Sequence, residues 1–125
     1  MESLSPNLFV KDINETIEFY KTLGFNVVMT VPETGDFVWA MVMCGGVTFM
    51  FQTFTSLGDG LPDVSRAGGG SLLLYNKHKN IRTFFDSVKD KVTVIQGLEK
   101  TFYGATEFST RDNNGFLLTF AEDEQ

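Results

Sequence analysis

The stretch RDNNGFLLTFAE, residues 111–122, holds two adjacent signals that decide how the chain folds. Its polar part, from Asp112 to Gly115, consists of Asp, Asn and Gly, the residue types that favour tight turns. The apolar run that follows has the composition of a strand. The stretch therefore predicts a hairpin that ends the chain. Asp112 is expected to accept local backbone hydrogen bonds in this turn, as is Asp36 in an earlier one.

Working back from this hairpin, the chain shows the order strand, helix, three strands twice. The first expected helix has Asp12 and Glu15 at the spacing of a capping box and Gly24 as its stop. The second has apolar residues at 81, 84, 85 and 88, which is the spacing of one helical face. The expected strands lie at residues 3–10, 25–31, 37–43 and 47–53, and then at 71–75, 92–97, 102–110 and 116–122.

The two halves are expected to form an internal repeat. Placing Phe19-Tyr20 over Phe84-Phe85 gives an offset of 65 positions, and placing Gly46 over Gly115 in the hairpins gives 69. The segment between the halves is rich in Gly, Pro, Ser and Asp, as connectors are. We expect a single domain over residues 1–125, made of a first module at 1–53, a connector at 54–69 and a second module at 70–125.

Composition limits the class of protein. The 125 residues are 42% hydrophobic and include 13 Phe, which predicts a globular chain with a real core. The net charge of −6 disfavours nucleic acid and anionic membranes as partners. Neither a signal peptide nor an apolar run long enough to span a membrane is visible, so we expect a cytoplasmic protein. Cys44 is the only cysteine, and its apolar neighbours favour a small buried side chain over a reactive thiol.

Two stretches carry a resemblance to a known family. LFVKDINETIEFYKTLGF (residues 8–25) and FYGATEFSTRDNNGFLLTFAE (residues 102–122) resemble the vicinal oxygen chelate superfamily. This superfamily includes glyoxalase I, extradiol dioxygenases, fosfomycin-resistance enzymes and the metal-free bleomycin-resistance proteins. The chain departs from the usual Asp-Pro-Asp-Gly turn, since it has Asp-Asn-Asn-Gly. The resemblance implies an α+β fold in which two βαβββ modules form a half-open mixed-sheet barrel around a cavity, with helices outside, and frequently a homodimer.

The resemblance also raises the question of a metal. Metal-dependent members draw His and Glu ligands from the first and last strands of each module, and these places fall here on Ser5, Met50, Gly70 and Thr119. None has the imidazole or carboxylate that zinc, iron, manganese or nickel requires. The single histidine, His78, is expected at the start of the second helix, solvated and outside the barrel. We therefore expect no metal and no other cofactor.

Seven residues are the candidates to line the cavity that the resemblance implies. Period-two alternation places Met50, Gln52 and Thr119 on the cavity side of their strands. Trp39 and Tyr103 suit core or dimer packing at least as well as ligand contact. The full set of candidate ligand-binding residues is Phe9, Trp39, Met50, Gln52, Tyr103, Glu107 and Thr119.

Glu107 offers two interpretations. A solvated or paired carboxylate is the simpler one, given its neighbours in the strand. If the side chain points into an aromatic pocket instead, it favours a cationic or amine-bearing planar ligand.

Three functions remain open on the sequence. The first is a metal-free homodimer that binds a small aromatic or apolar compound, as the bleomycin-resistance branch does. The second is a glyoxalase-like lyase, isomerase or dioxygenase, which the missing metal ligands disfavour, although Glu107 could act as a general base without metal. The third is a non-catalytic module whose barrel is filled by its own side chains. We favour the first, and so expect binding rather than catalysis.

Overall fold

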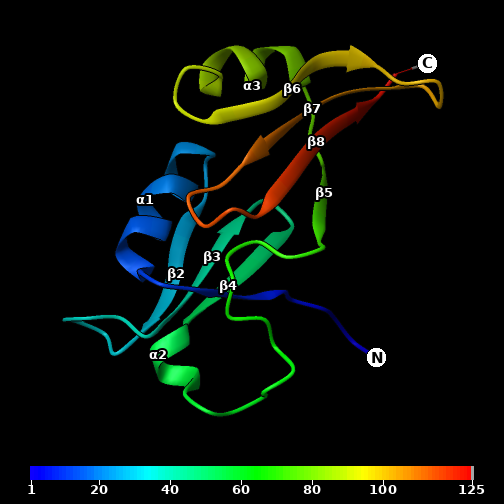
Figure 1. The fold of residues 1–125 in the computed structure, drawn as a ribbon. Helices are drawn as coiled ribbons and strands as arrows, with labels where there is room; N and C mark the ends of the chain where they lie inside the picture. Colours follow the sequence, from blue (N-terminus) through cyan, green and yellow to red (C-terminus); the bar gives the residue numbers. More distant parts are fainter. Residues whose placement is uncertain (125) are drawn as a thin grey trace. The chain divides into compact units, whose positions relative to one another are not determined.

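Each half of the chain has the element order strand, helix, three strands, as Figure 1 shows. The computed structural model describes residues 1–124, and Gln125, the last residue of the expected second module, lies outside the described residues. The chain divides into two compact units between Gly68 and Gly69. They are considered one at a time below.

The first unit contains one four-stranded sheet and two helices. The sheet order is β1-β4-β3-β2, with β1 parallel to β4 and the other pairs antiparallel. The elements are β1 (Asn7–Val10), α1 (Ile13–Thr22), β2 (Asn26–Val31), β3 (Trp39–Cys44), β4 (Val47–Thr53) and α2 (Phe54–Leu57).

Helix α1 begins and ends where the sequence predicts. The Asp12 side chain accepts a hydrogen bond from the Glu15 backbone N–H at 3.0 Å, which caps the N-terminus. Gly24 has φ +99°, a conformation open to glycine, and so lets the chain leave the helix. Tyr20 is fully buried on the inner side of α1, where its ring lies 4.8 Å from that of Phe51 on β4. One face of the first sheet is thus covered by α1.

The second unit repeats this plan. Its sheet order is β5-β8-β7-β6, again with one parallel pair, β5 with β8. The elements are β5 (Leu73–Lys77), α3 (Ile81–Val88), β6 (Thr93–Lys100), β7 (Ala105–Arg111) and β8 (Leu117–Asp123).

Helix α3 covers one face of the second sheet. The ring of Phe84 lies 5.1 Å from that of Phe120, and the ring of Phe85 lies 4.9 Å from that of Phe108. The carboxylate of Glu122 on β8 accepts hydrogen bonds from two backbone N–H groups at the start of the helix, which ties α3 to the sheet. Phe120 therefore faces α3.

The register corrects the repeat offset. Ile13 and Ile81 both begin their helices, so the helices match at 81 minus 13, or 68 positions, and not at 65. The first strands give the same offset of 68. Asn7 in β1 pairs with Met50, and Tyr75 in β5 pairs with Thr119, which occupies the equivalent place in the last strand. The aromatic pairs Phe19-Tyr20 and Phe84-Phe85 are not equivalent, because the buried Tyr20 of α1 corresponds to the buried Val88 of α3 and not to Phe85. The fold class, α+β with two βαβββ modules, is confirmed.

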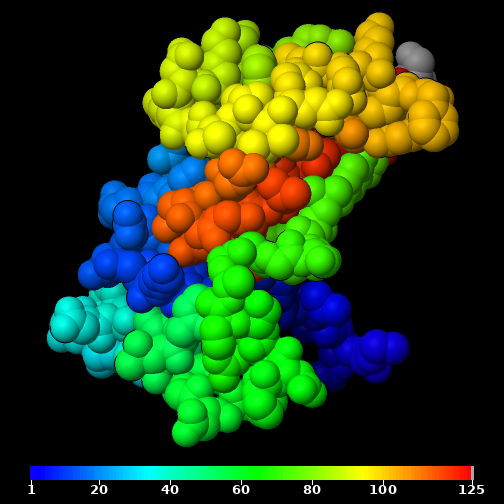
Figure 2. Space-filling view, viewed as in Figure 1, coloured from blue at the N-terminus to red at the C-terminus, as the bar shows by residue number. Residues whose placement is uncertain are grey.

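The connector is more ordered than its composition predicts. It begins with α2, where the Thr53 hydroxyl caps the helix by accepting from the Ser56 backbone N–H. Further on, the Arg66 guanidinium donates to four backbone carbonyls, those of Gly58, Gly60, Leu61 and Val64. Figure 2 shows the outer surface of this segment in green. A single side chain thus holds a nine-residue loop together.

Two smaller expectations are also corrected. Tyr103 lies in the turn before β7 and not in a strand, because Gly104 has φ +86° and the strand begins only at Ala105. Cys44 is half-buried at the end of β3 and not fully inside the core. Among residues 1–124, no helix is long and apolar enough to cross a membrane.

Candidate functional site

Each sheet has a face turned away from the helix that packs on it, which we call its open face. In the first unit, the register of β1, β3 and β4 brings side chains of three kinds together there: aromatic rings, amides and thioethers. All are half-buried. The open face of the first sheet carries Asn7, Phe9, Trp39, Met41, Met50 and Gln52.

The centre of this face is an amide between two aromatic side chains. Gln52 on β4 pairs with Phe9 on β1 and with Trp39 on β3. The Asn7 amide donates to the Gln52 carbonyl at 3.0 Å, which fixes the Gln52 side chain and leaves its own N–H groups for other acceptors. The Asn7 Oδ1 atom is buried without a hydrogen-bond partner in the described part of the chain. Burying an acceptor without a partner destabilises the fold, so a ligand group that donates a hydrogen bond to this atom would bind favourably.

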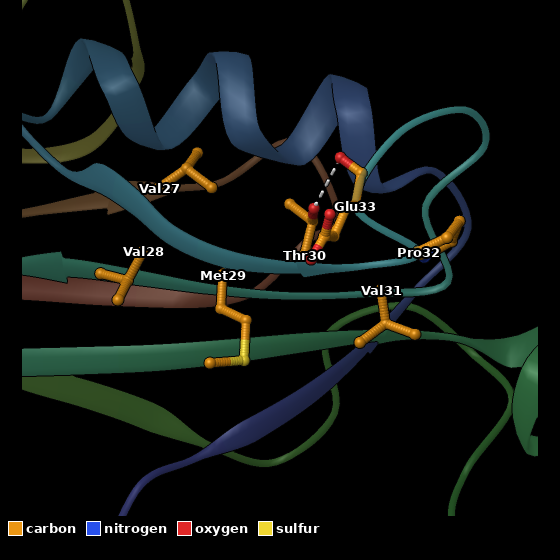
Figure 3. A pocket seen from close by; sticks show the side chains of 7 residues that line it. All are labelled: Val27, Val28, Met29, Thr30, Val31, Pro32 and Glu33. Carbon is orange, nitrogen blue, oxygen red and sulfur yellow. Dashed lines mark hydrogen bonds between the residues drawn. The ribbon is translucent and has the colours of Figure 1, made fainter.

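A row of methionines runs beside it. Met50 pairs with Met41, and Met41 pairs with Met29 on the edge strand β2. Along β2 lies an open hollow of about 600 Å³ lined by residues 27–33. Figure 3 shows the side chains that line it, with Met29 and Val31 on one side of the strand. Thioether chains are flexible and polarisable, so this row can adapt to apolar ligands of different shapes.

The open face of the second sheet has a different chemistry. The Tyr75 and Tyr103 hydroxyls both donate to the Oε2 atom of Glu107, at 3.1 Å and 2.9 Å. Partial burial, followed by the hydrogen bond to Glu107, raises the pKa of the Tyr75 hydroxyl well above its usual value. Tyr75 therefore stays protonated and acts as a donor. We call these three residues the Tyr-Glu-Tyr cluster.

A hydroxyl pair lies next to the cluster on the same face. Ser109 Oγ and Thr119 Oγ1 are 2.8 Å apart, on the paired strands β7 and β8. Thr119 is only 3% exposed, so its hydroxyl is committed to Ser109.

The structure therefore divides the seven predicted site residues into two groups. Four lie together on the open face of the first sheet, and two lie in the Tyr-Glu-Tyr cluster, with Thr119 buried nearby in the second sheet. Tyr75 was missed, although its place in SLLLY, two strands from Glu107, could have been found with the right register. His78 is not simply solvated, because its ring stacks on Phe84 at 3.9 Å.

The sequence profile of the Glyoxalase/Bleomycin resistance protein/Dioxygenase superfamily matches residues 4–120. The chain belongs to this superfamily. No curated protein sequence matches the chain. The suspected family is thereby confirmed.

Solved structures of the superfamily fold resemble the chain over its whole length. TioX from Micromonospora sp. ML1 has a TM-score of 0.79 and 21% identity, covering 98% of this chain and 99% of its own. A glyoxalase/bleomycin resistance protein/dioxygenase family enzyme from Burkholderia phytofirmans PsJN has a TM-score of 0.77 and 16% identity, covering 95% and 96%. The bleomycin resistance determinant encoded on the transposon Tn5 has a TM-score of 0.70 and 21% identity, covering 100% of both chains. At these identities the likeness shows the fold alone.

The positions that hold metal ligands in the superfamily carry no suitable donor side chain here. The corrected offset moves the expected position in β5 from Gly70 to Leu73, while Ser5, Met50 and Thr119 keep their places. None carries a carboxylate or an imidazole. Within residues 1–124, no group of three or more His, Cys, Asp or Glu could hold a metal ion. The donor set thus does not fit a divalent transition metal.

Proposed function

We propose that this protein is a metal-free small-molecule-binding member of the superfamily, which binds an aromatic or apolar compound on the open face of its first sheet. The observation that carries the proposal is the amide of Gln52 set between Phe9 and Trp39, with the unpartnered Asn7 Oδ1 beside it. Aromatic faces with a few convergent polar groups are the usual make-up of a ligand site.

The chemistry of this face favours a planar ligand with one polar edge. The rings of Phe9 and Trp39 offer stacking surfaces, and burying such surface is the main source of affinity for apolar compounds. Gln52 can donate and Asn7 can accept, so a ligand with an acceptor beside a donor would satisfy both amides. Met41 and Met50 would adjust to its outline.

A homodimer and a cytoplasmic location belong to the same proposal. Support for the dimer comes from β2, an edge strand with exposed Val28, Met29 and Val31 and no charged side chain from residue 26 to residue 31. Such an edge invites pairing with another strand. Sedimentation velocity at micromolar concentration should give twice the 14.0 kDa chain mass, and a monomer there would contradict the dimer.

Ligand binding is tested by thermal shift with two panels, one of planar heteroaromatic compounds and one of zinc, nickel and manganese salts. A ligand present at a hundred times its dissociation constant stabilises by about 2.7 kcal/mol, so a rise in Tm of roughly 8 °C is expected from the best aromatic compound. The metal salts should give no shift, because the donors are missing.

Trp39→Ala supplies the specific control for this experiment. It should lower the affinity for the best compound about tenfold or more through lost ring contact. Val38→Ala, a neighbouring exposed apolar residue outside the strand, should leave it unchanged. A shift with metals alone, or full affinity in Trp39→Ala, would refute the proposal.

A further inference from the structure

In the Tyr-Glu-Tyr cluster, only one of the two carboxylate oxygens of Glu107 accepts a hydrogen bond from the tyrosines. Both phenol hydroxyls donate to Oε2 of Glu107, and no residue from 1 to 124 donates to Oε1. The two tyrosines fix the orientation of the carboxylate, since each hydroxyl holds the same atom from a different element, Tyr75 on β5 and Tyr103 in the turn before β7. Oε1 is thus a positioned acceptor with unused capacity.

The two tyrosines that hold this carboxylate, and a phenylalanine in contact with one of them, are exposed to solvent. Tyr75 is 44% exposed and Tyr103 is 56% exposed, and the ring of Phe102, which is fully exposed, meets that of Tyr103 edge to face at 5.1 Å. Exposed aromatic rings close to a carboxylate present negative π faces to a cation. The cluster therefore offers both a hydrogen-bond acceptor and ring faces to the same ligand group.

The charges around the cluster are consistent with a cationic guest. Glu99 on β6 stands directly opposite Glu107, so a second negative charge lies across the strands. The ammonium group of Lys77 lies over the Tyr75 ring, 5.3 Å from the centroid, and it forms an ion pair with Asp123. Lys77 shows that this ring accepts a cation, while its own charge is balanced by Asp123 and not by Glu107.

We propose that the Tyr-Glu-Tyr cluster is a recognition site for an organic amine in which a protonated N–H group donates to Oε1 of Glu107 and the cation lies against the rings of Tyr103 and Phe102. This inference rests on the proposed function, because it names the class of small aromatic compound that the open face of the second sheet would bind. It predicts that the protein prefers aromatic amines to neutral compounds of the same shape.

Isothermal titration with three matched probes tests it: naphthylmethylamine, its quaternary N-trimethyl analogue and naphthylmethanol. The amine should bind about tenfold tighter than the neutral alcohol, because a hydrogen bond to a charged group is stronger than one between neutral groups. The quaternary analogue has no N–H, so it should bind more weakly than the amine. Equal affinity for amine and alcohol would overturn the inference.

Two variants separate the specific contact from overall charge. Glu107→Gln should remove the preference for the amine and keep the affinity for the alcohol, while Asp90→Asn, an exposed acid just beyond α3 that changes the net charge equally, should alter the preference by less than about twofold. Equal losses in both variants would overturn the site. Binding of the alcohol without any preference for the amine overturns this inference alone, whereas no binding by any probe overturns the proposed function too. Thermal unfolding checks that both variants are folded.

Discussion

Phe108→Ala is expected to lower the free energy of unfolding by about 3–5 kcal/mol, the range for removing a buried phenylalanine. Phe108 is fully buried on the helix side of β7. Its ring lies 4.9 Å from Phe85 on α3 and 5.4 Å from Phe120 on β8. The alanine leaves a cavity between helix and sheet that neighbouring rings cannot fill. Urea denaturation followed by far-UV circular dichroism measures the change.

Phe102→Ala is the matched control, because the same atoms are removed from a fully exposed side chain. It should change the free energy of unfolding by less than about 0.5 kcal/mol, as surface substitutions usually do. Similar losses in the free energy of unfolding for the two variants, or a loss below about 1 kcal/mol for Phe108→Ala, would contradict the described packing of α3 on the second sheet.

Asp112→Ala is expected to lower the free energy of unfolding by about 2–3 kcal/mol, since hydrogen bonds to a charged group are the stronger ones. The carboxylate is only 5% exposed, and its Oδ1 accepts from the backbone N–H groups of Asn114 and Phe116, both at 2.8 Å. Removing it leaves these donors without that acceptor inside the last hairpin. Asp112→Asn should lose less, because an amide oxygen can still accept. Chemical denaturation of the three proteins gives the comparison.

Asp36→Ala is the matched control for Asp112→Ala, because it removes the same carboxylate from another turn. Asp36 lies in the turn between β2 and β3 of the first unit, where it is exposed. Its replacement should cost less than about 0.5 kcal/mol. An equal loss in both aspartate variants would mean that Asp112 does not organise the hairpin.

Most of the fold could be predicted from the sequence because its signals are local. The Asp12 cap, the Gly24 stop and the turn that begins at Asp112 each depend on residues a few positions apart, and each appears where expected. Helix α2 was missed because its four residues are held by the Thr53 cap and not by a periodic pattern. The Arg66 contacts cannot be predicted from the sequence, because every residue has a backbone carbonyl and no residue type marks those that accept.

The candidate site was predictable only in part, since it depends on register between distant strands. Alternation correctly placed Gln52 and Met50 away from α1, but the partnership of Gln52 with Asn7 needs the pairing of β1 with β4. In the same way, Tyr75 reaches Glu107 across 32 positions of sequence. A three-residue error in the repeat offset was enough to hide that contact.

The two halves are alike on the helix side of their sheets and differ on the other side. On β4 and β8 the helix-side pairs, Phe49 with Leu118 and Phe51 with Phe120, remain large and apolar, whereas the opposite pairs are Met50 with Thr119 and Gln52 with Ala121. Substitutions on the open faces can therefore alter what either half binds without disturbing the interior that keeps it folded.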